Sequence, residues 1–272
     1  MRQLQAKAIE WNVRLDEIRE TPTSLLGFGT RDDVRVVLKM SKRLGDESRS
    51  GEVLQAYAGE GAVRVYESEF GAVLLERLEP GEQLVDVVKR GEDAEATKIL
   101  AKVIGRLANH EAPSGCPTVA DWGRGFDRYL QSDNEHIHHK VVEEAGEIYQ
   151  QLTSSQHKTM LLHGDLQHYN VLFDNKRGWI AIDPKGVIGE LEYELGALLR
   201  NPVELPEVFA NPVTIKRRLK SLTVALHLDY FRALHWSYAQ SILSAIWDIE
   251  DGHPFTHDNP SLLLARTVKQ LL

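Results

Sequence analysis

The stretch His163-Gly164-Asp165-Leu166-Gln167-His168-Tyr169-Asn170 decides the fold class of this chain. Asn170 follows Asp165 by five residues and His163 precedes it by two, which is the spacing of a loop that carries out phosphoryl transfer. That reaction needs a carboxylate that orients the attacking hydroxyl and accepts its proton, and an amide oxygen that binds magnesium. We therefore predict Asp165 as the catalytic base and Asn170 as a Mg²⁺ ligand.

A second carboxylate follows the predicted strand Trp179-Ile180-Ala181-Ile182. This carboxylate, Asp183, comes thirteen residues after Asn170 and is followed by Pro184-Lys185-Gly186. Magnesium prefers hard carboxylate oxygen and completes its shell with water and phosphate. We predict that Asp183 binds the metal ion that bridges the nucleotide phosphates.

The upstream part of the chain supplies the other groups that a bound nucleotide needs. Residues 34–40 are rich in β-branched side chains and predict a strand, near whose end Lys39 can bind phosphate. Glu52 lies on the next predicted helix, and an ion pair with Lys39 would fix the ammonium against the phosphates. Gly27 and Gly29 precede the strand, and we predict that they form the turn over the nucleotide.

The chain changes character near residue 78. Residues 1–78 contain several predicted strands and an opening helix, which the spacing of Leu4, Ala8, Trp11 and Leu15 extends to residue 15. Residues 79–272 contain long amphipathic helices interrupted by prolines. The sequence predicts an α+β fold with a nucleotide-binding lobe in 1–78 and a helical lobe in 79–272.

Composition narrows the function classes. The 272 residues are 42% hydrophobic and carry a net charge of −8, which disfavours a nucleic-acid binder and suits a cationic small molecule. The single cysteine, Cys116, excludes an internal disulfide and a zinc site built on cysteines. No apolar run is long enough for a membrane span, and the first ten residues do not resemble a signal peptide. We expect a cytoplasmic protein with no obligate protein partner.

With these residues in view, the chain resembles the aminoglycoside phosphotransferase branch of the protein-kinase-like superfamily. The His-Gly-Asp and Ile-Asp-Pro-Lys-Gly motifs are typical of antibiotic kinases, and the streptomycin 6-kinase and hydroxyurea phosphotransferase group is the most similar. The resemblance implies a small antiparallel-sheet N-lobe, a larger helical C-lobe, and ATP with Mg²⁺ as cofactors. It also implies that Lys39 binds the α- and β-phosphates, and that the backbone of Glu76, Arg77 and Leu78 meets the adenine.

The substrate is predicted less directly than the chemistry. Acidic side chains after the metal aspartate and near the last long helix would suit a guanidinium or ammonium substrate, or they form a solvated charged face; they include Glu190, Glu192, Asp248 and Asp251. Lys185 either supplies a cation near the transferred phosphate or pairs with an acidic neighbour. We expect phosphorylation of a streptomycin-type aminoglycoside, and thus antibiotic resistance. The alternatives are a kinase of hydroxyurea or another small metabolite, and a pseudokinase that only binds nucleotide.

Overall fold

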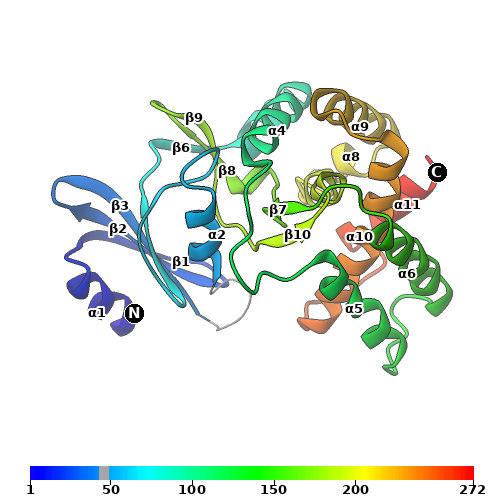
Figure 1. The fold of residues 1–272 in the computed structure, drawn as a ribbon, viewed down its shortest axis with the longest axis horizontal. Helices are drawn as coiled ribbons and strands as arrows, with labels where there is room; N and C mark the ends of the chain where they lie inside the picture. Colours follow the sequence, from blue (N-terminus) through cyan, green and yellow to red (C-terminus); the bar gives the residue numbers. More distant parts are fainter. Residues whose placement is uncertain (43–48) are drawn as a thin grey trace.

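The computed structural model describes residues 1–42 and 49–272, and Figure 1 shows a sheet-containing lobe beside a larger helical lobe. The N-terminal lobe is a five-stranded antiparallel sheet in the order β1-β2-β3-β5-β4. Its elements are α1 (Arg2–Glu10), β1 (Arg14–Glu20), β2 (Ser24–Arg31), β3 (Val34–Ser41), α2 (Ser50–Ala56), β4 (Val65–Glu69) and β5 (Ala72–Glu76).

The two faces of this sheet have different neighbours, because successive side chains of a strand point to opposite faces. Val36, Leu38 and Leu74 pack with Leu4 of α1 in a small core on the outer face. Lys39 lies on the opposite face, which lines the cleft between the lobes. The pattern of β3 therefore delivers Lys39 to the cleft side.

The C-terminal lobe is built from helices around two small sheets, one of order β6-β8-β9 and one of order β10-β7. Its strands are β6 (Pro80–Gln83), β7 (Met160–Leu162), β8 (Val171–Asp174), β9 (Gly178–Ala181) and β10 (Val187–Gly189). Its α-helices are α3 (Leu84–Lys89), α4 (Asp93–Leu107), α5 (Val119–Leu130), α6 (His139–Ser154), α7 (Leu195–Leu199), α8 (Pro206–Phe209), α9 (Pro212–Leu226), α10 (Tyr230–Glu250) and α11 (Pro260–Lys269). Two short 3₁₀ helices, η2 (His168–Asn170) and η3 (Leu191–Glu194), complete the lobe.

Local signals set several helix starts in this lobe. Thr118 and Asp121 form a reciprocal capping box at the start of α5, and Asn211 and Asn259 cap α9 and α11. Such side chains satisfy the free N–H groups of a first helical turn. None of the helices in the described part of the chain has the length and hydropathy of a membrane span.

The predicted α+β, two-lobed architecture is confirmed, with one local correction. The opening helix ends at Glu10, and Leu15 lies in β1, which pairs with β2 as a hairpin. The spacing of apolar residues predicted too long a helix, because Trp11 and Val13 are also buried in the core between helix and sheet. The burial of these residues therefore does not follow a single periodicity.

Candidate active site

The predicted catalytic loop, residues 163–170, is organised around His163, which is buried. Its Nε2–H donates to the carbonyl of Ile182 at 2.8 Å, and its Nδ1 accepts from the N–H of Asp165 at 3.3 Å. These two bonds together require the neutral tautomer protonated on Nε2. Burial lowers the pKa of His163, which agrees with a neutral ring. The imidazole thus connects the loop that carries Asp165 to the strand end before Asp183.

Asn170 lies against Asp165. Its side-chain N–H group donates to the Asp165 carbonyl at 2.9 Å and lies 3.4 Å from the Asp165 carboxylate. The Asn170 carbonyl accepts from the N–H of Ile182 at 2.9 Å. The structure therefore brings together three residues that the sequence predicted from two motifs: Asp165 and Asn170 from the first, and Asp183 from the second.

Asp183 and Lys39 form an ion pair across the cleft. The Lys39 side chain is 10% exposed, whereas the Asp183 side chain is 36% exposed. Asp183 has φ of +61°, a left-handed conformation that aspartate tolerates better than most residues and that often marks functional sites. The phosphate-binding lysine and the metal-binding carboxylate of the prediction are thus direct neighbours.

The predicted pair between Lys39 and Glu52 is wrong for this structure. Glu52 lies on α2 with its side chain about half exposed, and it accepts from the Arg49 guanidinium at 2.9 and 3.1 Å. Arg49 precedes Glu52 by three residues, and this spacing makes the two side chains neighbours on a helix. Lys39 forms its ion pair with Asp183 instead.

A cleft of about 550 Å³ separates the lobes and contains Lys39 and Asp183 in its lining. The prediction that Gly27 and Gly29 form the turn over the nucleotide is wrong, because both lie within β2. A Cβ on Gly27 would come 2.7 Å from a Leu15 methyl group, and one on Gly29 would overlap the Arg14 carbonyl oxygen. These glycines permit close packing on the outer face. Phe28 between them lines the cleft, with the guanidinium groups of Arg19 and Arg77 over its ring at 4.8 and 5.2 Å.

The turn that borders the cleft is rich in hydroxyl groups and lies between β1 and β2. Thr21, Thr23 and Ser24 line the cleft, and Thr21 Oγ1 accepts from the N–H of Ser24 at 2.9 Å. The Ser24 hydroxyl is buried and has no hydrogen-bond partner among the described residues. This turn was not predicted, because the prediction relied on the glycines at positions 27 and 29. The Thr-Pro-Thr-Ser run between two apolar segments was the available signal.

Glu194 binds backbone N–H groups of the predicted catalytic loop, a role that was not predicted from the sequence. Its buried carboxylate accepts from the N–H of Gly164 at 3.1 Å and from that of Leu166 at 3.4 Å. Burial raises the pKa of Glu194 to about 7, although the N–H donors act in the opposite direction. Glu194 therefore holds the backbone on both sides of Asp165.

The predicted hinge borders the same cleft. Glu76, Arg77 and Leu78 all contribute to its lining. The N–H of Glu76 donates to Arg64 and that of Arg77 to Arg35, at 3.0 and 3.2 Å. Within residues 1–42 and 49–272 the N–H of Leu78 donates no hydrogen bond.

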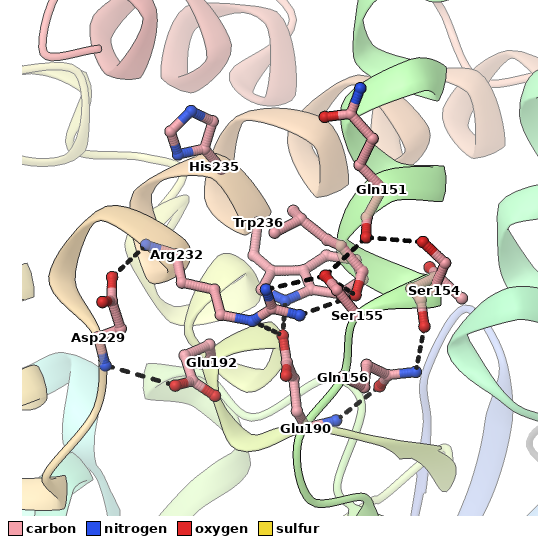
Figure 2. Close-up of polar contacts among 12 residues, drawn as sticks. Gln151, Ser154, Ser155, Gln156, Glu190, Glu192, Asp229, Arg232, His235 and Trp236 are labelled. Atoms are coloured by element: carbon pink, nitrogen blue, oxygen red, sulfur yellow. Dashed lines mark hydrogen bonds and ion pairs between the residues drawn. The ribbon is translucent and has the colours of Figure 1, made fainter.

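The acidic residues predicted to bind substrate do not form one site. Glu190 is 2% exposed, and its carboxylate accepts from Arg232 and from the indole N–H of Trp236 (Figure 2). Its own N–H donates to Gln156 at 3.0 Å. Because this carboxylate is almost fully buried and is paired with Arg232 inside the protein, the assignment of Glu190 to the substrate is wrong.

The remaining carboxylates lie at opposite ends of α10. Glu192 accepts from the N–H of Asp229 at 3.4 Å, where α10 begins, whereas Asp248 lies near its end. At about 1.5 Å per residue the two ends are roughly 28 Å apart, too far for one small ring. Beside Asp248, the ring of Trp247 packs edge-to-face on that of Trp122, with the ring centroids 5.5 Å apart, and Trp122 lies against Gly164.

The geometry therefore excludes Glu192 from a site shared with Asp248. Asp248 accepts from Asn259 at 2.8 Å and is 35% exposed. Asp251 is exposed at the end of α10. Both stay predictions as substrate ligands. Lys185 is half-buried, and its ammonium is in none of the ion pairs formed among the described residues, which disfavours the acidic-neighbour alternative.

The donor set fits Mg²⁺. Asn170 uses its side-chain nitrogen to hold Asp165, so its amide oxygen remains for a metal, and the Asp183 carboxylate is partly exposed. No group of three or more carboxylate, histidine or cysteine side chains that could hold a metal occurs in the described part of the chain. Two protein ligands suit an ion that takes the rest of its shell from phosphate and water.

The chain is similar to a family of kinases, to individual members of that family and to solved structures. The model of the aminoglycoside/hydroxyurea antibiotic resistance kinases matches residues 11–252. Streptomycin 3''-kinase of Klebsiella pneumoniae is 31% identical, with 89% of this chain and 91% of that protein covered. Streptomycin 6-kinase of Streptomyces griseus is 29% identical, with 92% and 83% covered. The aminoglycoside phosphotransferase APH(4)-Ia, solved as a thermostable mutant with ADP and hygromycin B, has a TM-score of 0.67 at 13% identity, with 99% of this chain and 98% of that chain covered, and supports the fold.

Proposed function

Because the chain belongs to the aminoglycoside/hydroxyurea antibiotic resistance kinase family and is a phosphotransferase acting on a small molecule, we propose that it uses ATP to phosphorylate a hydroxyl of a streptomycin-type aminoglycoside. The observation that carries the reaction is the convergence of Asp165, Asn170, Asp183 and Lys39 beside one cleft. Similarity to two streptomycin kinases over most of their length supports the substrate.

In the proposed reaction Asp165 accepts the proton of the substrate hydroxyl as its oxygen attacks the γ-phosphorus. The new bond joins the substrate oxygen to phosphorus, the bond to the β-phosphate oxygen breaks, and ADP leaves. Lys39 lies in the cleft wall, where its ammonium can bind phosphate oxygens. Asn170 and Asp183 would hold Mg²⁺, which supplies charge neutralisation to the phosphates.

The cleft also supports adenine as the base. The unpaired N–H of Leu78 can donate to N1 of adenine, which is an acceptor, whereas N1 of guanine carries a hydrogen. The hydroxyl-rich turn of Thr21, Thr23 and Ser24 offers donors to phosphate oxygens at the same cleft. The Leu78 N–H therefore favours ATP over GTP, whereas the hydroxyl groups would serve the phosphates that both nucleotides share.

A second candidate substrate is hydroxyurea or another small, weakly charged alcohol. Glu190 is buried in an ion pair with Arg232, and Glu192 lies beside the start of α10, so Asp248 and Asp251 are the two of the four predicted carboxylates that can share a site. An unpaired charge in a cleft is costly, and fewer carboxylates support a less highly charged acceptor.

The test is an ATP-coupled assay of purified protein with streptomycin, hydroxyurea and a neutral sugar alcohol. Asp165→Asn serves as the matched inactive control. We expect the highest kcat/KM with streptomycin, and NMR of the product would identify the phosphorylated hydroxyl. Turnover of hydroxyurea or the neutral alcohol without turnover of streptomycin would overturn the antibiotic assignment and leave the kinase chemistry intact.

A further inference from the structure

The hinge carboxylate Glu76 has a partner from the other lobe. Arg177, in the turn between β8 and β9, forms an ion pair with Glu76, and the two side chains are 14% and 12% exposed. Its second terminal nitrogen donates to the carbonyls of Gly59 and Ala62, the latter at 3.2 Å. One guanidinium therefore connects the hinge, the loop after α2 and the β8–β9 turn.

The same turn also binds the hinge on its other side. The Asp174 carboxylate accepts from the N–H of Glu79 at 3.1 Å and from that of Arg177 at 2.9 Å. The Glu79 carbonyl accepts from the N–H of Asn175 at 2.8 Å. The turn therefore holds Glu76 and Glu79, the residues on either side of the Arg77–Leu78 segment.

Strand β9 connects the turn that carries Arg177 to the part of the cleft that contains Asp183. The N–H of Val63 donates to Ala181 at 2.9 Å, and the N–H of Ala181 donates to Gly61 at 2.8 Å. Ala181 lies two residues before Asp183. The hairpin that carries Arg177 thus also carries the predicted metal ligand, and Arg177 acts at its opposite end.

We propose that Arg177 is a positioning residue for the nucleotide base: by holding the Glu76 carboxylate, it fixes the hinge so that the Leu78 N–H faces the adenine. The assignment rests on the proposed use of ATP in this cleft. Arg177 does not line the cleft and contacts the base only through the hinge. Removal of Arg177 would leave the largely buried Glu76 carboxylate without its main charge partner. Because an unpaired buried charge is costly, we expect Glu76 to move toward water.

The experiment measures binding of the nucleoside part and of the phosphate part of ATP separately. Adenosine and magnesium tripolyphosphate are measured as competitive inhibitors against ATP in the wild-type protein and in Arg177→Ala. We expect the Ki for adenosine to rise at least about tenfold, equivalent to about 1.4 kcal/mol. The Ki for tripolyphosphate and the KM for the acceptor should stay within about twofold, because neither ligand uses the hinge.

Matched variants keep the result interpretable if Arg177→Ala folds poorly. Arg177→Lys keeps the charge but loses the forked geometry, so it should raise the Ki for adenosine less than alanine does. Arg64→Ala removes the same charge from a guanidinium that is 3.9 Å from Glu76 and mostly exposed, and it should leave both inhibitors unchanged. Glu76→Gln should weaken adenosine as Arg177→Ala does, and combining it with Arg177→Lys should add little further loss.

A folded Arg177 variant with wild-type inhibition by adenosine would overturn the assignment. An equal loss of adenosine and tripolyphosphate binding would also overturn it, because that pattern indicates general damage to the cleft. Wild-type protein that binds neither ATP nor adenosine would instead refute the proposed function, and the role of Arg177 with it.

Discussion

Replacing Glu194 by glutamine tests whether a buried carboxylate supports the catalytic loop. Glu194 accepts from the N–H groups of Gly164 and Leu166 and has a pKa raised to about 7 by burial. Glutamine keeps the size and one acceptor oxygen but cannot titrate. Comparing the two proteins across pH therefore isolates the protonation of this one group.

The sign follows from proton linkage. The pKa of Glu194 is about 7 in the folded protein and 4.5 in the reference state, so the folded state binds this proton more tightly. The stabilisation is fully present below pH 4.5 and is lost as pH rises through 7. At about 1.4 kcal/mol per pKa unit, the free energy of unfolding should fall by about 2–3 kcal/mol between pH 5 and pH 8 from this group alone.

The assay is urea unfolding followed by tryptophan fluorescence at several pH values between 5 and 8. The stability of wild type relative to Glu194→Gln should decrease by about 2–3 kcal/mol over this range. Glu192→Gln makes the same chemical change two residues away and should retain the wild-type pH dependence. A stability difference between wild type and Glu194→Gln that stays constant with pH would refute the reasoning.

Three further substitutions test the site. Asp165→Asn should lower kcat by about 10²–10⁴-fold and leave Mg²⁺–ATP affinity within about twofold, and a near wild-type rate would remove Asp165 as the base. Asp183→Ala should weaken Mg²⁺–ATP binding measured by calorimetry at least about tenfold, whereas unchanged affinity would place the metal elsewhere. Glu190→Gln should destabilise the fold by about 1–3 kcal/mol, because it removes the charge that pairs with the half-buried Arg232, and it should leave the acceptor KM unchanged. A stable Glu190→Gln protein with a raised acceptor KM would return Glu190 to the substrate site.

Much of the fold and chemistry could be predicted from short stretches of sequence. The spacing from His163 to Asn170, the strand end before Asp183 and the strand that carries Lys39 are local patterns. Each is fixed by the backbone geometry of one loop or strand, so the order of residues contains the information. The two-lobed architecture followed because the chain changes from strands to helices near residue 78.

The partners of charged residues could not be predicted in this way. Glu190 and Glu194 look alike in sequence, yet the first binds Arg232 and Trp236 and the second binds catalytic-loop N–H groups. Glu52 pairs with Arg49 rather than Lys39. A carboxylate takes the donors that tertiary packing places beside it, and these lie 28 to 46 residues away for Glu190 and Glu194.

The sequence by itself therefore determined the class of reaction and predicted the catalytic loop and the residues proposed to bind phosphate and metal, because these depend on local spacing. Only the tertiary structure decided which acids are buried in internal ion pairs, which hydroxyl-rich turn borders the cleft between the lobes and that Arg177 pairs with Glu76. Those features arise from burial and from contacts between distant segments. Arg177 and Glu76 are 101 residues apart in the chain, and no local pattern connects them.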